Sequence, residues 1–161
     1  MFGPPSNRLK DQEFILRFFA LLLPWRSYTK PMKEFLNRFT AKYRNEDPAL
    51  LQNWEKRFHE TVDVAWQAFG KTAFRPSGAL NAAVFDSVMV GLAQRLGKGP
   101  IDTLDRIRIA YKRLLSDPEY SDATSRATSD EQSVERRLPR LEKHLPRYKC
   151  RILRYLGRFS A

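Results

Sequence analysis

Residues that build disulfides, metal centres and phosphate-binding loops are scarce in this sequence of 161 residues. The one cysteine, Cys150, excludes an intrachain disulfide, and the two histidines, His59 and His144, lie far apart. A metal centre needs three or four ligands at suitable spacing, and no such cluster occurs in the sequence. The seven glycines form neither G-x-x-x-x-G-K-[ST] nor G-x-G-x-x-G. The sequence therefore predicts no catalytic residues, no cofactor and no metal site, and we expect the chain not to be an enzyme on its own.

A hydrophobic run long enough to cross a membrane is also lacking. The most apolar stretch, residues 14–25, is shorter than the roughly 20 residues of a span and carries Arg17 near its middle. Asp11 and Glu13 flank this stretch, and its end lacks the small residues of a signal-peptide cleavage site. We interpret it as a mostly buried helix, in which Glu13 and Arg17 lie four residues apart and can pair. A cytoplasmic location is favoured, since a single cysteine suits a reducing compartment.

Apolar residues recur at spacings of three and four in five segments, which predicts helices. Proline in a first turn or glycine after a last turn marks several of their ends. The five expected helices cover residues 11–23, a segment beginning near 31, and residues 47–69, 81–96 and 102–115. A capping box at residues 129–132 begins a sixth helix. Residues 116–127 are polar and are expected to form a loop with a turn at Asp117.

These elements predict an all-α fold, a single multi-helix orthogonal bundle with a basic C-terminal helical extension. The expected organisation is an N-terminal loop (1–9), a helical domain (10–145) and a basic tail (146–161). The first helix is expected to lie at the centre of the bundle. One buried stripe is expected to contain Trp54, Phe58, Val62, Trp66, Phe18, Phe19, Phe35 and Phe85.

Five successive blocks resemble one bacterial family. The blocks read LKDQEFILRFFALL, YTKPMKEFLNRF, FGKTAFRP, NAAVFDSVM and YSDATSRATSDEQSVERRL. Their types and order, over about residues 8–145, resemble the GmrS-type, ParB-nuclease-like proteins of modification-dependent restriction and phage-defence systems. The resemblance is to the helical second half of a longer domain.

The resemblance also implies what this chain does not carry. The first half of the family domain is a ParB/sulfiredoxin-like fold, with an Asp-Gly-Gln-Gln-Arg motif that serves nucleotide hydrolysis. No Asp-Gly dipeptide occurs in this sequence, so no family catalytic residue has a counterpart here. The family's frequent fused nuclease of His-Asn-His type is also absent. The resemblance therefore implies a truncated gene product, or a subunit whose protein partner supplies the catalytic half.

Positive charge is concentrated at the C-terminal end of the sequence. Residues 136–161 hold nine Lys/Arg and one acid, Glu142, and so contribute +8 of the net charge of +11. On a helix, four arginines of this segment would lie within about 60° of arc. The candidate nucleic-acid-binding residues are Arg147, Lys149, Arg151, Arg154 and Arg158.

Three interpretations of this tail remain open. It is a solvated helix that docks an apolar face on the body, a segment that binds nucleic-acid phosphates, or, less favoured, a segment that binds an anionic membrane surface. For the chain as a whole, three functions compete. It is a non-catalytic helical part of a GmrS-like protein that contacts protein and DNA, a fragment of a split NTP-dependent nuclease, or a stand-alone basic nucleic-acid-binding or scaffold protein.

Overall fold

The computed structural model describes residues 10–101 and 103–145. Within these residues every element is helical except for an isolated bridge between Ser77 and Ala79, which confirms the predicted all-α bundle. The expected N-terminal loop and basic extension lie outside the described residues. In chain order the elements are α1 (Lys10–Leu22), η1 (Trp25–Ser27), α2 (Met32–Tyr43), α3 (Pro48–Phe69), η2 (Gly70–Thr72), α4 (Ala82–Leu96), α5 (Leu104–Leu115), α6 (Pro118–Ser125), α7 (Glu131–Arg137) and α8 (Arg140–His144).

The five helices predicted from periodicity are present as α1 to α5, with ends close to the expected ones. The loop expected over residues 116–127 is wrong, because most of it is α6. Asp117 accepts hydrogen bonds from the backbone N–H groups of Glu119 and Tyr120, so it caps this helix as Asp47 caps α3. Tyr120 is buried, which anchors the short helix to the core.

α7 begins where the capping box predicts, but the capping hydrogen bonds are not those expected. Asp130 is the N-cap residue and its side chain makes no capping hydrogen bond. The Glu131 carboxylate instead accepts a hydrogen bond from the backbone N–H of Lys30 at 2.8 Å, and the Lys30 ammonium lies 3.1 Å from Asp130. The polar residues at the start of α7 therefore attach it to the segment before α2.

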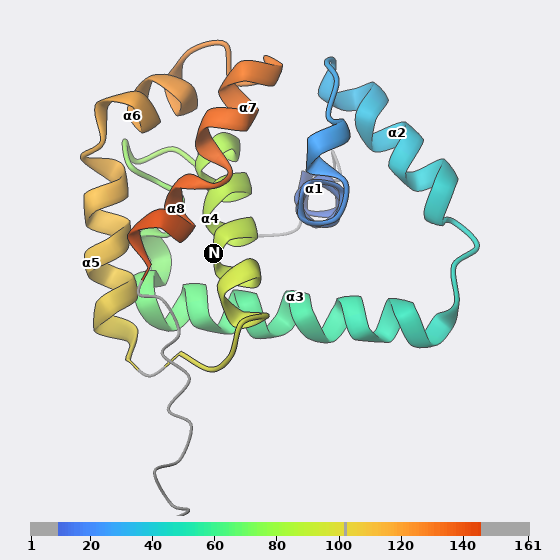
Figure 1. Cartoon of the computed structure of the whole chain (residues 1–161), viewed down its shortest axis with the longest axis horizontal. Coiled ribbons are helices and arrows are strands. Elements are labelled where there is room, and N and C mark those ends of the chain that lie inside the picture. The colour runs from blue at the N-terminus through green and yellow to red at the C-terminus, as the bar shows by residue number, and fades with distance from the viewer. Residues whose placement is uncertain (1–9, 102, 146–161) are drawn as a thin grey trace, which may run out of the picture.

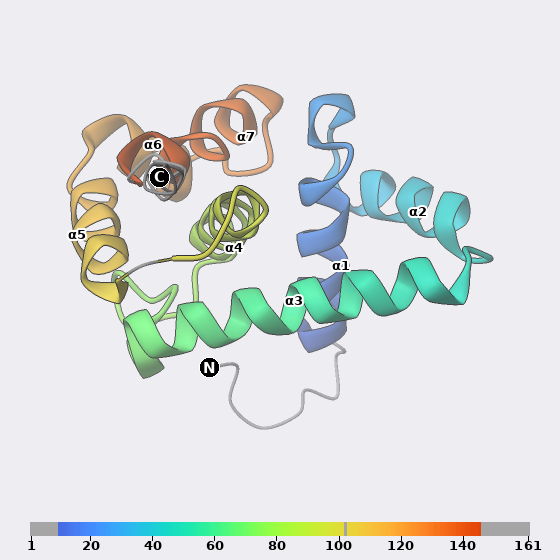
Figure 2. The ribbon, with the colours of Figure 1, turned by 60° about the horizontal axis from the view of Figure 1, so that its bottom comes forward.

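α4 is the central helix, and twelve of its fifteen residues are buried. It contacts α1, α3, α6, α7 and α8, and Figure 2 shows α3 lying across α1 and α4. The expectation that α1 would be central is wrong, since α4 contacts more of the other helices and Ile15 of α1 is 40% exposed. Small side chains explain the difference, because residues such as Gly91 let neighbouring helices approach α4 closely.

The predicted core stripe is only partly correct. Phe18, Phe35 and Phe85 are buried, and Phe19 packs against Trp54 with ring centroids 5.5 Å apart. Trp54, Phe58 and Val62, however, are only half-buried, and Trp66 is 44% exposed. The most buried face of α3 is made of the smaller residues Thr61, Ala65 and Ala68.

The angular position of Trp66 on α3 explains why its side chain is exposed. It comes directly after the buried Ala65, and one residue corresponds to about 100° of rotation. The aromatic residues of α3 therefore lie on the flank of its buried face. Trp54 and Phe58 pack there against α1, Phe58 with its ring centroid 5.2 Å from that of Phe18, whereas Phe69 packs on Tyr111 of α5.

The close approach of α4 and α8 at Gly91 gives a test of the packing (Figure 1). An added Cβ at Gly91 would lie 2.9 Å from the Cβ of Leu141. We expect Gly91→Ala to lower the free energy of unfolding, because overpacking costs about 1–3 kcal/mol and exceeds the roughly 1 kcal/mol gained in helix propensity. Urea unfolding measures this change.

Gly97→Ala is the control for that substitution. A Cβ at Gly97 would meet the end of the flexible Arg57 side chain, which can move aside, so this variant should lose less stability. A Gly91→Ala protein as stable as the unmodified chain would contradict the close packing of α4 and α8.

Trp66 tests the orientation of α3. Because its side chain is 44% exposed, we expect Trp66→Ala to cost about 1–2 kcal/mol, whereas Phe18→Ala, at a fully buried position, should cost about 3–5 kcal/mol. Urea unfolding of both variants checks the order. Equal losses would show that Trp66 belongs to the core after all.

Candidate functional site

A buried group of three charges connects α1, α4 and α7. Asp86 of α4 is fully buried and accepts hydrogen bonds from Arg17 Nε at 3.0 Å and from the Arg17 guanidinium at 2.5 Å. Arg137 of α7 donates to the same carboxylate at 3.1 Å. The predicted pair of Glu13 and Arg17 also forms, at the longer distance of 3.7 Å.

Burial and charge act in opposite directions on the two arginines. Burial lowers the pKa of Arg137, and the attraction of Asp86 only partly opposes this. Burial also disfavours the charge of Arg17, but Asp86 and Glu13 outweigh it and raise the pKa of Arg17. Both groups stay charged, since guanidinium groups do not deprotonate in proteins. The three charges thus form a closed unit with both Asp86 oxygens engaged.

This unit holds helices together and is poorly suited to catalysis. A general acid or base must reach substrate, and Asp86 is closed off from solvent and bound by two cations. Arg137 uses a further N–H to bond the backbone oxygen of Thr128 at 2.6 Å, which fixes the chain before α7. Asp86 is the residue that sequence reasoning missed, although a lone acid within an otherwise apolar helix is a signal of a buried partner.

A second buried polar contact lies on the same helix. Ser87 and Tyr120 share a hydrogen bond of 2.6 Å, and burial raises the pKa of Tyr120. The hydroxyl therefore stays protonated at neutral pH and joins α4 to α6 as a neutral hydrogen-bonding group. This contact too lies within the core.

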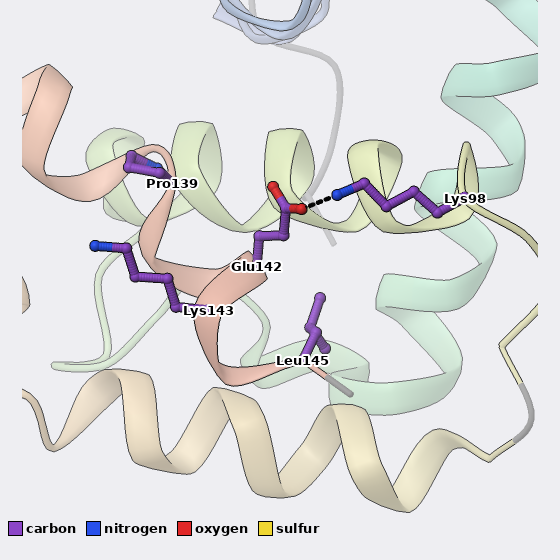
Figure 3. A pocket seen from close by; sticks show the side chains of 5 residues that line it. All are labelled: Lys98, Pro139, Glu142, Lys143 and Leu145. Carbon is purple, nitrogen blue, oxygen red and sulfur yellow. Dashed lines mark hydrogen bonds and ion pairs between the residues drawn. The ribbon is translucent and has the colours of Figure 1, made fainter. Parts of the chain in front are cut away.

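A surface pocket of about 570 Å³ lies where the described chain ends. Figure 3 shows Lys98, after α4, paired with Glu142 of α8 across this pocket, while Lys143 points away from that pair. Pro139 and Leu145 complete the lining. Two lysines and one acid give the pocket a small positive charge, and the basic tail starts directly after Leu145.

The predicted nucleic-acid-binding residues of the tail, Arg147, Lys149, Arg151, Arg154 and Arg158, lie outside the described residues. The basic residues just before them lie within the described residues, and they differ in exposure and in ion pairing. Arg140 is engaged by Asp117 and Glu119, whereas Arg136 and Lys143 are exposed. Pro139 separates two helices, because α7 ends at Arg137 and α8 begins at Arg140.

The described residues contain neither a metal-ligand cluster nor a membrane-spanning helix. In residues 10–101 and 103–145, no group of three or more His, Cys, Asp and Glu could hold a metal ion. His59 is exposed on α3 and lies 3.7 Å from Glu55, one turn away on the same helix. Over the same residues, no helix combines the length and apolar character that a membrane crossing requires.

No family model, no curated protein and no solved structure matches this chain.

The charged unit in the core gives a stability prediction. Asp86→Ala should lower the free energy of unfolding by about 3–5 kcal/mol, because it leaves Arg17 and Arg137 buried without their counter-charge. Asp63→Ala, at an exposed position of α3, is the control and should stay within about 0.5 kcal/mol of the unmodified chain. Urea unfolding measures both.

A combined variant separates the loss of charge balance from the loss of packing. Arg17→Met, Asp86→Leu and Arg137→Met together replace the three charges with apolar side chains, and this should cost less than Asp86→Ala alone. If Asp86→Ala and Asp63→Ala were equally stable, the buried ion pairs would not matter for the fold.

Proposed function

We propose that this chain is a non-catalytic helical module that contacts nucleic-acid phosphates through its basic C-terminal segment. We further propose that it is the helical part of a GmrS-like restriction or phage-defence protein and acts in the cytoplasm. The observation that carries the proposal is the segregation of charge, since residues 136–161 contribute +8 of the net +11. Such a basic segment is the electrostatic footprint of nucleic-acid binding.

The bundle and the tail differ in how their charges are matched. Within the described residues many cations already have acidic partners, among them Arg17, Lys30, Lys98, Arg108, Arg137 and Arg140. The segment 146–161 has five cations and no acid. The cations of this segment therefore have no acidic residue near them in sequence, and an external polyanion would provide the negative charge.

The composition of the tail favours contacts to phosphate over the reading of bases. Asn and Gln, which pair with adenine through two hydrogen bonds, do not occur in residues 146–161. Lysine and arginine contacts to phosphate position a protein on nucleic acid but carry no sequence information. Binding should thus depend strongly on salt and weakly on sequence.

A second function is supported by exposed apolar side chains on the bundle. Ile15 of α1 is 40% exposed and Trp66 of α3 is 44% exposed. Exposed apolar side chains favour contact with a protein partner, because such a contact removes them from water. They would suit a protein partner that carries the nucleotide-hydrolysing half of the family domain, with which this chain would form a split NTP-dependent nuclease.

The tail proposal is tested by replacing its five cations with glutamine in the full chain. If all five meet phosphate, the slope of log K against log salt for duplex DNA should change from about −4 to −5 toward zero. The matched control carries five exposed cations of the body replaced in the same way: Lys33, Arg44, Lys56, Lys71 and Arg126. Fluorescence anisotropy at several salt concentrations gives the slopes.

A chain that ends at Leu145 provides a second arm of the test. Leu145 is buried and its N–H bonds the backbone oxygen of Leu141 at 3.1 Å, so this cut keeps α8 in place. Tail-dependent binding to anionic vesicles with little preference for DNA would favour the membrane interpretation. Equal DNA affinity for the full chain, the tail variant and the shortened chain would end the proposal.

A further inference from the structure

We propose that the outer face of α5 is a second phosphate-contacting surface, which works together with the tail on the same nucleic acid. The residues that would make the contacts are Arg106, Lys112 and Arg113. This inference rests on the proposed function and extends it from the tail to the folded bundle.

α5 is strongly two-sided. Its buried face consists of Ile107, Ala110, Tyr111 and Leu114, which belong to the main core. The opposite face carries the three cations with Ile109, which is 50% exposed. At 100° per residue these four positions fall within about 120° of arc, and Arg106 and Arg113 are nearly in line. The helix thus presents its cations together on one side.

The three cations are free to bind an external anion. Within residues 10–101 and 103–145 their side chains make no hydrogen bond and no ion pair. The acid of the same helix, Asp105, is already engaged by Arg108 at 2.7 Å. Arg108 also donates to the backbone oxygens of Ala68 and Gln67 on α3. One arginine of α5 therefore has a structural role, and the other three cations do not.

The acids nearest to the ends of this face have partners too. Asp117 and Glu119, directly after α5, both pair with Arg140 of α8. Glu142 of α8 pairs with Lys98. These acids are thereby engaged elsewhere, and within the described residues the three α5 cations have no ion-pair partner.

α5 is a neighbour of the last described helix. It packs against α8 (Figure 1), and Leu141 and Leu145 share the main core with the buried face of α5. The outer face of α5 points away from that contact. Lys143 of α8 is exposed as well, and the basic tail follows Leu145 in sequence. Binding by both surfaces therefore requires a polyanion long enough to reach around α5.

The size of the α5 face suits a nucleic-acid strand. Arg106 and Arg113 are seven residues apart, which is about 10 Å along a helix. At about 3.4 Å of duplex axis per phosphate on one strand, this length corresponds to about three phosphates. Arg106 lies at one end of this length and Lys112 and Arg113 lie at the other, so the face can contact phosphates at both ends of such a stretch.

The test uses the full chain with Arg106→Gln, Lys112→Gln and Arg113→Gln combined, titrated with duplex DNA at 50 and 200 mM salt. If each cation meets one phosphate, the slope of log K against log salt should shrink by about 2.7. Over this salt range the affinity of the unmodified chain should then fall about 40-fold more than that of the variant. Urea unfolding of the variant verifies that the bundle is intact.

The matched control replaces Lys33, Arg44 and Lys56, three exposed cations on or beside α2 and α3, with glutamine. It changes the net charge equally, so it measures the general effect of charge. An α5 variant whose slope equals that of this control overturns the inference. Absence of measurable DNA binding by the unmodified chain overturns it as well.

The tail variant and the α5 variant together distinguish which of the two surfaces binds DNA. If the tail variant loses DNA binding and the α5 variant has the same salt slope as its control, the tail proposal stands and the α5 surface is rejected. If the slope of log K against log salt shrinks in the α5 variant but not in the tail variant, the result supports the α5 surface and rejects the tail. If the slope of log K against log salt shrinks in both variants, the tail and the α5 face act together on the same DNA.

Discussion

The carboxylate of Asp86 is the group on which the arrangement of the helices depends. It is fully buried on the central helix α4, and it binds Arg17 from α1 and Arg137 from α7. Each of these ions would be costly to bury alone, so the three must be brought together wherever the fold forms. Apolar packing alone tolerates several orientations of helices, whereas this contact fixes which faces of α1, α4 and α7 meet.

The bundle treats its charges in two ways, according to whether they lie between helices or face solvent. Charges that join helices are matched, such as Arg140 with Asp117 and Lys30 with Asp130. Cations that make no ion pair within the described residues lie on the surface, among them those of the outer face of α5 and Lys33, Arg44 and Lys56. The internal network therefore stabilises the contacts between helices, and the unmatched cations of the described residues face solvent.

Much of this fold could be predicted from sequence, because its signals are local. Spacings of three and four, together with helix starts such as Asp47-Pro48, gave five helices with nearly correct ends. α6 was missed although Asp117-Pro118 is the same kind of start, because its eight residues are too few to show an apolar period. Local signals thus identify long helices better than short ones.

What depends on distant partners could not be predicted in the same way. Periodicity places Trp66 near the buried face of α3 but cannot say where the neighbouring helices lie, and the residue is 44% exposed. The pairing of Arg17 with Glu13 was expected from spacing, while its stronger partner Asp86 is 69 residues away. The family resemblance stays a prediction, and so does the tail site, which lies outside the described residues.

The contacts between the two ends of the described chain also affect the order in which it folds. The hydroxyl of Tyr28 bonds the backbone oxygen of Ser129, 101 residues away, and Arg137 reaches back 51 residues to Asp86. Most helical bundles rely on neighbours in sequence and fold quickly for that reason. Here the buried carboxylate gains its second cation only when α7 arrives, so a chain growing on the ribosome completes its core after nearly all of its helices have been made.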